Sequence, residues 1–207
     1  MTPKRGFFVT IEGIEGAGKS TLAQALANHF TGIGREVVLT REPGGTRIGD
    51  AIRGMLLADG EEMSARTELL LFEAARAQHV EELIRPALSE GKVVICDRFA
   101  DSSLAYQGRA RGFGEGSVQA LNDFATGATN PGITLLLDLP AEIGLARQSG
   151  LDRISSEGLT FHESVRQGYL SLAEAEPQRI KVIDARSNTQ AVLESALQAI
   201  EAALEVK

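Results

Sequence analysis

The sequence predicts an α/β fold in which a parallel sheet is covered by helices on both faces. Short apolar runs alternate with longer segments of helical periodicity along the 207 residues, and this alternation is typical of strands joined by right-handed crossovers. The run over residues 92–96 is almost continuously apolar, as expected for a strand buried on both faces. The length and the hydrophobic content of 43% fit a single domain over residues 1–207.

Each element is expected from a local pattern, and no internal repeat or low-complexity linker interrupts the series. Apolar runs predict strands over residues 7–12, 36–40, 92–96, 133–138 and 180–183. Helical spacing predicts helices from residue 21 to glycines 32 and 34, and over 48–56, 67–88, 102–107, 117–125, from about 141, over 161–175, and over 192–204. The helix over residues 67–88 is the longest of these, and Pro86 could break it, because proline interrupts the hydrogen bonds of a helix.

The first strand runs into a glycine-rich phosphate-binding motif. Gly13–Ser20 has the form G-x-x-x-x-G-K-S and lies between the first strand and the first helix, as this motif requires. Backbone N–H groups of such a loop turn toward phosphate oxygens. The fold is therefore P-loop NTPase-like, and the residues expected to bind a nucleoside triphosphate are Gly13, Ile14, Glu15, Gly16, Ala17, Gly18, Lys19, Ser20 and Thr21.

Charge and composition narrow the class of protein. A net charge of −7 argues against a general nucleic-acid surface, which needs a basic stripe. Cys96 is the only cysteine, which excludes an intrachain disulfide and fits a reducing cytoplasm. No apolar run approaches the length of a membrane span, and the one near the N-terminus is too short for a signal sequence. We expect a cytoplasmic protein without nucleic-acid or membrane partners.

Charged side chains follow several predicted strands. Glu12 and Glu15, Arg41, and the pair Asp97-Arg98 all lie just past strand ends, and ligands of such sheets bind beyond these ends. An apolar strand that ends in Asp97 is typical of a magnesium-binding acid beside a phosphate loop. Ser20 and Asp97 are therefore the expected Mg²⁺ ligands.

The arginines indicate a second phosphorylated substrate. Several lie in or beside predicted loops and site-facing helices: Arg53, Arg76, Arg98, Arg147 and Arg153. Two polyanions must be held together against their repulsion, and guanidinium groups suit that task. A phosphate acceptor is already ionised, so transfer to it requires positioning and charge neutralisation rather than a general base.

Phe72 and Arg76 are four residues apart and share one helix face. A ring and a guanidinium together can stack on a planar base and bond to its edge. Core packing of Phe72 and a surface pair for Arg76 explain the spacing equally well. His29, His79 and His162 are isolated in sequence and are expected to be structural or exposed.

Longer strings of residues resemble the bacterial type of thymidylate kinase over nearly the whole chain. Besides the phosphate loop they comprise residues 40–46 (TREPGGT), 72–79 (FEAARAQH), 97–99 (DRF), 105–108 (AYQG) and 151–154 (LDRI). The resemblance implies ATP- and Mg²⁺-dependent phosphorylation of dTMP to dTDP, a step toward dTTP. A different nucleoside monophosphate kinase and a regulatory ATPase are the alternatives; the Asn-Lys-x-Asp string expected of a GTPase switch does not occur.

The resemblance also implies roles for individual residues. Phe72 would stack on thymine, Arg76 would bond to its edge, and Ser103 and Tyr106 would lie near base and sugar. Arg53 and Arg98 would hold the acceptor phosphate, and Glu15 would meet the sugar 3′-hydroxyl or magnesium-bound water. The dTMP-binding set is then Glu15, Arg53, Phe72, Arg76, Arg98, Ser103, Tyr106 and Gln107.

The catalytic arginine of this family comes from the phosphate loop or from a lid. Residues 14–17 of this chain contain no arginine, so a lid over about residues 148–158 must supply it, and Arg147 and Arg153 are the candidates. We hypothesise that Arg153 approaches the transferred group, with Lys19, Arg98 and Glu15 completing the catalytic set. The family is commonly homodimeric; Leu69, Leu70 and Leu71 could form such an interface or belong to the core.

Overall fold

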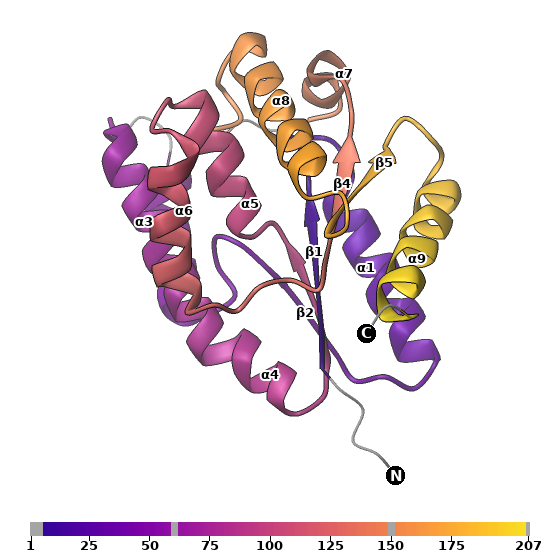
Figure 1. The fold of residues 1–207 in the computed structure, drawn as a ribbon. Helices are drawn as coiled ribbons and strands as arrows, with labels where there is room; N and C mark the ends of the chain where they lie inside the picture. Colours follow the sequence, from indigo (N-terminus) through magenta and orange to yellow (C-terminus); the bar gives the residue numbers. More distant parts are fainter. Residues whose placement is uncertain (1–5, 59–61, 149–151, 206–207) are drawn as a thin grey trace.

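Five parallel strands form the centre of the computed structural model, which describes residues 6–58, 62–148 and 152–205. Their spatial order is β2-β3-β1-β4-β5, so the chain crosses over repeatedly, as the alternation of elements predicts (Figure 1). The bounds are β1 Phe7–Glu12, β2 Val37–Arg41, β3 Val93–Asp97, β4 Ile133–Asp138 and β5 Ile180–Asp184. The predicted parallel sheet is confirmed, with strand ends that differ by about a residue.

Helices cover both faces of this sheet. Helices α1 and α9 pack against each other on one face, and α4, α5 and α8 lie on the other, with α3 and α6 outside α5 (Figure 1). The bounds are α1 Lys19–Gly32, α2 Arg47–Leu57, α3 Ala65–His79, α4 Arg85–Ser89, α5 Ala100–Ser103, α6 Glu115–Thr126, α7 Ala141–Ala146, α8 Leu159–Ala175 and α9 Thr189–Glu205.

Two helical segments wind more widely than an α-helix. The π-helical turn η1, Val80–Ile84, joins α3 to α4, so the helical path continues to Pro86 and beyond instead of breaking there. A wide turn tolerates the missing N–H of proline because the regular i→i−4 ladder is already interrupted. The second, η2, Leu104–Ala110, continues α5 and was not predicted as a distinct element.

The register of the central strands brings the predicted site residues level with one another. Asp97 of β3 is the neighbour of Ile11 on β1 and of Arg41 on β2. These residues are at the carboxyl ends of parallel strands, where the following loops must converge. The main core lies between the sheet and its helices, and a smaller cluster around Phe8 and Phe99 contains the fully buried Cys96.

The predicted lid lies between α7 and α8. Residues 149–151 of that segment lie outside the described residues, and residues 152–158 form a series of turns before Leu159 begins α8. None of the helices described, from α1 to α9, combines the length and the apolar character that a membrane crossing requires.

Candidate active site

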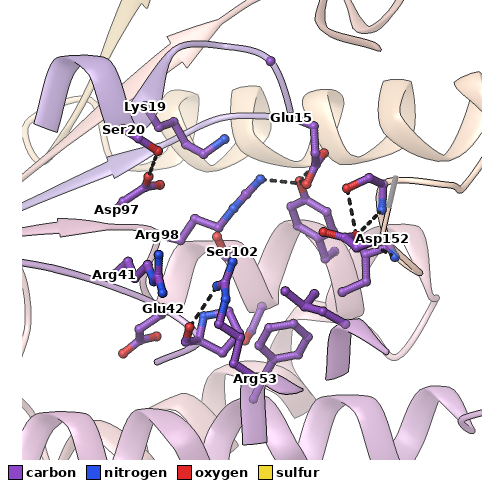
Figure 2. A pocket seen from close by; sticks show the side chains of 18 of the residues that line it. Glu15, Lys19, Ser20, Arg41, Glu42, Arg53, Asp97, Arg98, Ser102 and Asp152 are labelled. Carbon is purple, nitrogen blue, oxygen red and sulfur yellow. Dashed lines mark hydrogen bonds and ion pairs between the residues drawn. The ribbon is translucent and has the colours of Figure 1, made fainter. Parts of the chain in front are cut away.

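The phosphate loop has the strand–loop–helix setting that the motif requires. It leaves β1 at Gly13 and enters α1 at Lys19 (Figure 2). Gly16 has φ +71°, and a Cβ there would overlap the carbonyl of Gly144 in α7. The loop therefore turns through a conformation that a larger residue could not adopt in this space. The Lys19 ammonium donates to the carbonyl of Ile14, 2.7 Å away, across the mouth of the loop.

Lys19 has an unusual proton affinity for a lysine. Burial, together with the nearby positive charge of Arg98, lowers the pKa of Lys19 to about 8, against the opposing attraction of Asp97 and Glu15. A cation that is poorly solvated and repelled by a neighbour gains strongly from an incoming polyanion. The loop is therefore prepared for phosphate in both geometry and charge.

Ser20 and Asp97 meet as predicted. The Ser20 hydroxyl donates to Asp97 Oδ2 at 2.6 Å, which joins the first turn of α1 to the end of β3. A hydroxyl and a carboxylate side by side supply the hard oxygen ligands that Mg²⁺ prefers, and this ion usually takes only one or two protein ligands beside phosphate oxygens. The donor set fits magnesium.

A single cavity of about 560 Å³ joins the phosphate loop to the region of the arginines (Figure 2). Predicted residues on its wall are Glu15, Gly16, Lys19, Ser20, Arg53, Phe72, Asp97, Arg98, Ser103, Tyr106 and Gln107. Further lining residues are Arg41, Glu42, Pro43, Leu57, Ser102, Gln148, Asp152, Ile154 and Ser155. The cavity is large enough for nucleotide-sized ligands.

Glu15 and Arg98 form an ion pair on the cavity wall. Arg98 Nη2 lies 2.7 Å from Glu15 Oε1, and the Tyr106 hydroxyl donates to the same carboxylate. Burial raises the pKa of Glu15, but Arg98 and a contact with His162 outweigh it and hold the pKa well below its usual value. The Arg98 guanidinium also lies 5.0 Å from the centre of the Tyr106 ring, a cation–π distance. Glu15 is therefore ionised and fixed.

A second group of side chains lies farther along the same cavity. Arg53 donates to the carbonyl of Pro43 at 3.0 Å, so the proline-containing loop after β2 orients it. Burial, and then the charge of Arg41, lowers the pKa of Arg53 below its usual range. Phe72 of α3 supplies an aromatic wall there, and Ser103 and Gln107 are on the cavity wall too. This end combines cations with one ring.

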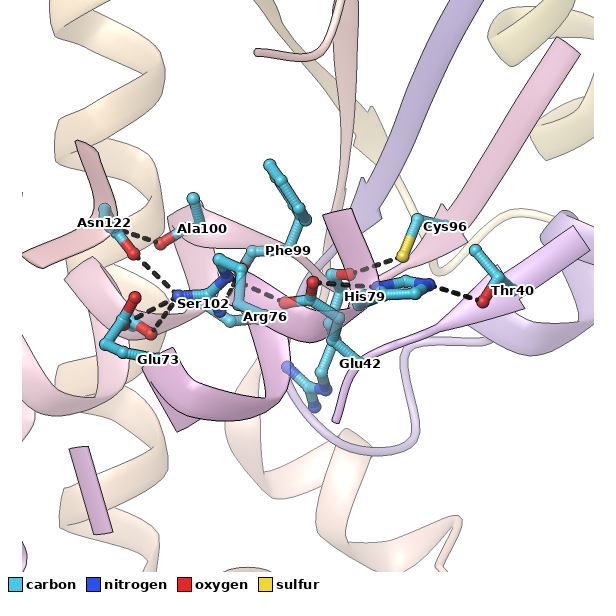
Figure 3. Close-up of polar contacts among 12 residues, drawn as sticks. Thr40, Glu42, Glu73, Arg76, His79, Cys96, Phe99, Ala100, Ser102 and Asn122 are labelled. Atoms are coloured by element: carbon cyan, nitrogen blue, oxygen red, sulfur yellow. Dashed lines mark hydrogen bonds and ion pairs between the residues drawn. The ribbon is translucent and has the colours of Figure 1, made fainter. Parts of the chain in front are cut away.

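Arg76 does not line the cavity, in contrast to its predicted role. It is 1% exposed, and its guanidinium contacts Glu42, Glu73, Ser103, Asn122 and the carbonyl of Phe99 (Figure 3). The surface alternative is wrong, because the side chain is at the centre of a buried network. Arg76 is connected to the cavity through two lining residues, Ser103, which accepts its hydrogen bond at 2.9 Å, and Glu42, which accepts one at 2.8 Å.

The same network contains a buried histidine. His79 Nδ1 is 3.0 Å from Glu42 Oε1, and its Nε2 is 2.8 Å from the Thr40 hydroxyl (Figure 3). His79 is therefore structural, as predicted, and it fixes the loop that carries Arg41 and Glu42 against α3.

Neither candidate lid arginine lines the cavity. Arg153 makes an ion pair with the buried Glu68 of α3 at 2.8 Å and donates to the carbonyl of Leu56. Arg147 donates to the carbonyl of Ala185, beyond β5. The predicted lid segment contributes Gln148, Asp152, Ile154 and Ser155 to the cavity wall instead.

Four functional candidates were missed from sequence. His162 and Tyr169 are on α8, far along the chain from the residues they contact, and no local pattern marks them. Ser102 lies beside the predicted Ser103, so only its actual orientation reveals its contact with Glu12. Asp152 belongs to the LDRI string, and that string was the available signal.

Comparison with known proteins agrees with this geometry. The family model described as thymidylate kinase matches residues 11–196. The chain belongs to the thymidylate kinase family. It is 51% identical to a thymidylate kinase of Protochlamydia amoebophila, over 97% of this chain and 94% of that protein. It is 54% identical to one of Pseudomonas fluorescens, over 87% of this chain and 88% of that protein.

A solved structure extends the agreement to the fold. The crystal structure of thymidylate kinase from Ehrlichia chaffeensis has a TM-score of 0.79 and is 34% identical in sequence. The match covers 95% of this chain and 99% of that one. The residues that line the cavity all lie within the range 11–196 that the family model matches.

Proposed function

We propose that this enzyme transfers the γ-phosphoryl group of ATP to dTMP and forms dTDP and ADP, in the synthesis of dTTP. One observation carries the proposal: a single cavity joins Lys19 and Ser20 of the phosphate loop to Arg98, Arg53 and Phe72. The first pair suits a triphosphate, and the second group suits a phosphorylated acceptor with a planar base.

The residues divide the work of transfer between two phosphates. Lys19 would neutralise the β- and γ-phosphates of ATP, and Arg98 and Arg53 would hold the acceptor phosphate in line with it. Glu15, already ionised and fixed by Arg98, would accept a hydrogen bond from the sugar 3′-hydroxyl. The acceptor oxygen needs no base, so the rate depends on alignment and charge neutralisation.

Magnesium is the cofactor we propose, held by Ser20 and Asp97. When bound it would neutralise phosphate charge beside Lys19. Among the base-site residues, Phe72 would stack on thymine, with Ser103, Tyr106 and Gln107 around it. Arg76 would act on the base edge next to Ser103, either through that hydroxyl or by exchanging one of its internal bonds.

The decisive test is ADP release from ATP·Mg²⁺ with dTMP, dUMP, dCMP, AMP, GMP or no acceptor. We expect strong turnover with dTMP, weaker turnover with dUMP, and none with the others. One methyl group contributes only about 1–3 kcal/mol to discrimination, so dUMP should remain detectable. Preference for another monophosphate would assign a different kinase, and acceptor-independent ADP release would instead indicate a regulatory ATPase.

We propose in addition that the enzyme works as a cytoplasmic homodimer. Leu69 is buried in the core, but Leu70 on α3 is 53% exposed and Phe124 on the adjoining α6 is 88% exposed. Apolar side chains exposed on neighbouring helices suit a second copy of the chain. Sedimentation equilibrium should give twice the mass of one chain, and a monomer at micromolar concentration would contradict the dimer.

A further inference from the structure

Arg98 adopts a backbone conformation that is unusual for its residue type. Its φ is +71°, in the left-handed region that disfavours side chains with a Cβ. Its guanidinium donates to the carbonyl of Gly13 at 3.0 Å, to Glu15 at 2.7 Å and to the Tyr169 hydroxyl at 3.2 Å. A residue held in this way depends on the surrounding structure to overcome the strain.

Glu12, at the end of β1, holds the segment that follows Arg98. Its carboxylate is completely buried and accepts hydrogen bonds from the N–H of Phe99, the hydroxyl of Ser102 and the hydroxyl of Tyr169, each at 2.7 Å. Because Tyr169 donates its one hydroxyl hydrogen to Glu12, its oxygen is left to accept the N–H of Arg98. Tyr169 therefore bridges the buried carboxylate and the arginine.

Tyr169 reaches this position from α8, the helix that begins directly after the lid. His162 precedes Tyr169 by seven residues, so the two share one face of the helix. The Nδ1 atom of His162 lies 3.0 Å from Glu15 Oε2, close enough for an ion pair, although the angle is not that of a hydrogen bond. One helix face therefore contacts both members of the Glu15–Arg98 pair.

A glycine permits this close approach. A Cβ on Gly168 would lie 3.1 Å from the Cα of Ala105 and 3.1 Å from the Arg109 side chain. Helix α8 thus packs closely on η2, the element that carries Tyr106. Tyr169 and Tyr106 accordingly lie with ring centres 6.2 Å apart in an edge-to-face arrangement.

We propose that Tyr169 is a positioning residue, which with Glu12 orients the Arg98 guanidinium toward the phosphate of the acceptor. The inference rests on the proposed function, because that function makes Arg98 the ligand of the dTMP phosphate. It adds that α8, rather than the strand β3 that precedes Arg98, sets the direction of this guanidinium.

The test replaces one hydroxyl group. Tyr169→Phe keeps the ring and its packing but removes the atom between Glu12 and Arg98. Because a hydrogen bond to a charged group is stronger than one between neutral groups, we expect the Kd for dTMP to rise about tenfold. Calorimetry should show an unchanged Kd for thymidine, which lacks the phosphate, and steady-state kinetics should show an unchanged KM for ATP.

The matched control is Thr10→Val, which also removes one buried hydroxyl from the same region. Thr10 is bonded to Thr134 at 2.8 Å, and Thr134 keeps Asp101 and Arg179 as partners. This variant should bind dTMP like the wild type. Equal losses for dTMP and thymidine, or the same loss in Thr10→Val, would show a merely structural role and overturn the inference, as would no change in Tyr169→Phe.

A second variant tests the inference if Tyr169→Phe does not fold. Glu12→Gln keeps the shape of the side chain but weakens the hydrogen bond that Glu12 accepts from Tyr169. The variant should raise the Kd for dTMP without raising the Kd for thymidine. Failure of the wild type to phosphorylate dTMP would overturn the proposed function alone, because the comparison of dTMP with thymidine binding is independent of turnover.

Discussion

The two ends of the cavity are built in different ways. At the phosphate loop, consecutive residues and their backbone groups form the site, and the side chains of Lys19, Ser20 and Asp97 lie beside them. At the end of the cavity that contains Arg53 and Phe72, side chains from distant elements are held by ion pairs such as the buried Arg76–Glu42 and the partly buried Arg98–Glu15. From this difference we expect that substitutions at the phosphate loop lower activity without lowering the stability of the fold. Substitutions at the other end should lower stability as well.

The largest effect is expected at the phosphate loop. Lys19→Met should lower kcat about 1000-fold, as expected for loss of one preorganised charge at the transferred group. The thermal midpoint should not fall, because the change removes a buried cation and leaves a side chain of similar length. Steady-state kinetics and a melting curve measure the two effects. A large fall in stability would break the contrast between the ends.

At the end that contains Arg53 and Phe72, Arg76→Met should chiefly destabilise the protein. It leaves Glu42 and Glu73 buried without their partner, which costs about 3 kcal/mol of unfolding free energy. Urea denaturation measures the loss. Arg85→Met is the control, because its pair with Glu81 is largely exposed and should contribute under about 1 kcal/mol. Similar losses in the two variants would contradict the structural role of Arg76.

The third prediction concerns Arg153 and Arg147, the two arginines considered for the catalytic role. Arg153→Ala should lower kcat about 100-fold with little change in the Kd for dTMP, because Arg153 is expected at the transferred phosphoryl group rather than at the base. In the described structure Arg153 pairs with Glu68, so reaching that group requires it to exchange this partner. Arg147→Ala is the matched comparison, and a loss confined to that variant would move the catalytic role to Arg147.

The smallest effect concerns pH. Because Lys19 has a pKa of about 8 in the free enzyme, it loses its charge as the pH rises through 8. The value of kcat/KM for ATP should therefore fall about tenfold per pH unit above 8. Bound phosphates favour the charged form, so kcat at saturating ATP should stay level to higher pH. A flat kcat/KM profile up to pH 9.5 would show that Lys19 keeps an ordinary pKa.

The same Lys19 shift has a consequence for stability. The native protein binds fewer protons than the unfolded chain between pH 8 and the ordinary lysine pKa of 10.5, so this group alone makes stability rise with pH in that window. Burial of the charged lysine destabilises the fold below pH 8, and that penalty is relieved as the proton leaves. A loop that sacrifices stability in this way is typical of a site built for an anion.

Sequence reasoning succeeded where the relevant residues are contiguous. The strand, the glycine loop and the helix of residues 7–32 are local patterns, and alternating elements imply the parallel sheet and the convergence of Arg41 with Asp97. Phe72 could be chosen only by resemblance, since its spacing equally fits core packing. The structure brings it to the cavity wall.

Contacts between side chains that are far apart in the chain could not be predicted from the sequence. Arg76 was expected at the surface or at the base edge, and its burial depends on Glu42 and Asn122, which are 34 and 46 residues away. Tyr169 meets Glu12 across 157 residues. No periodicity encodes such pairs, because they arise only when the sheet, α3, α6 and α8 have packed.

The wide turn η2 has a consequence for the lengths that this chain can tolerate. Along it, Tyr106 is directed to Glu15, Gln107 to Glu68, and Arg111, one residue beyond, also to Glu68. Deleting a single residue would rotate everything after it around the helix axis, so the side chains beyond the deletion would face other partners. The contact of Tyr106 with Glu15, and those of Gln107 and Arg111 with Glu68, could then no longer form together. We therefore expect this segment to tolerate substitutions more readily than the deletion of one residue.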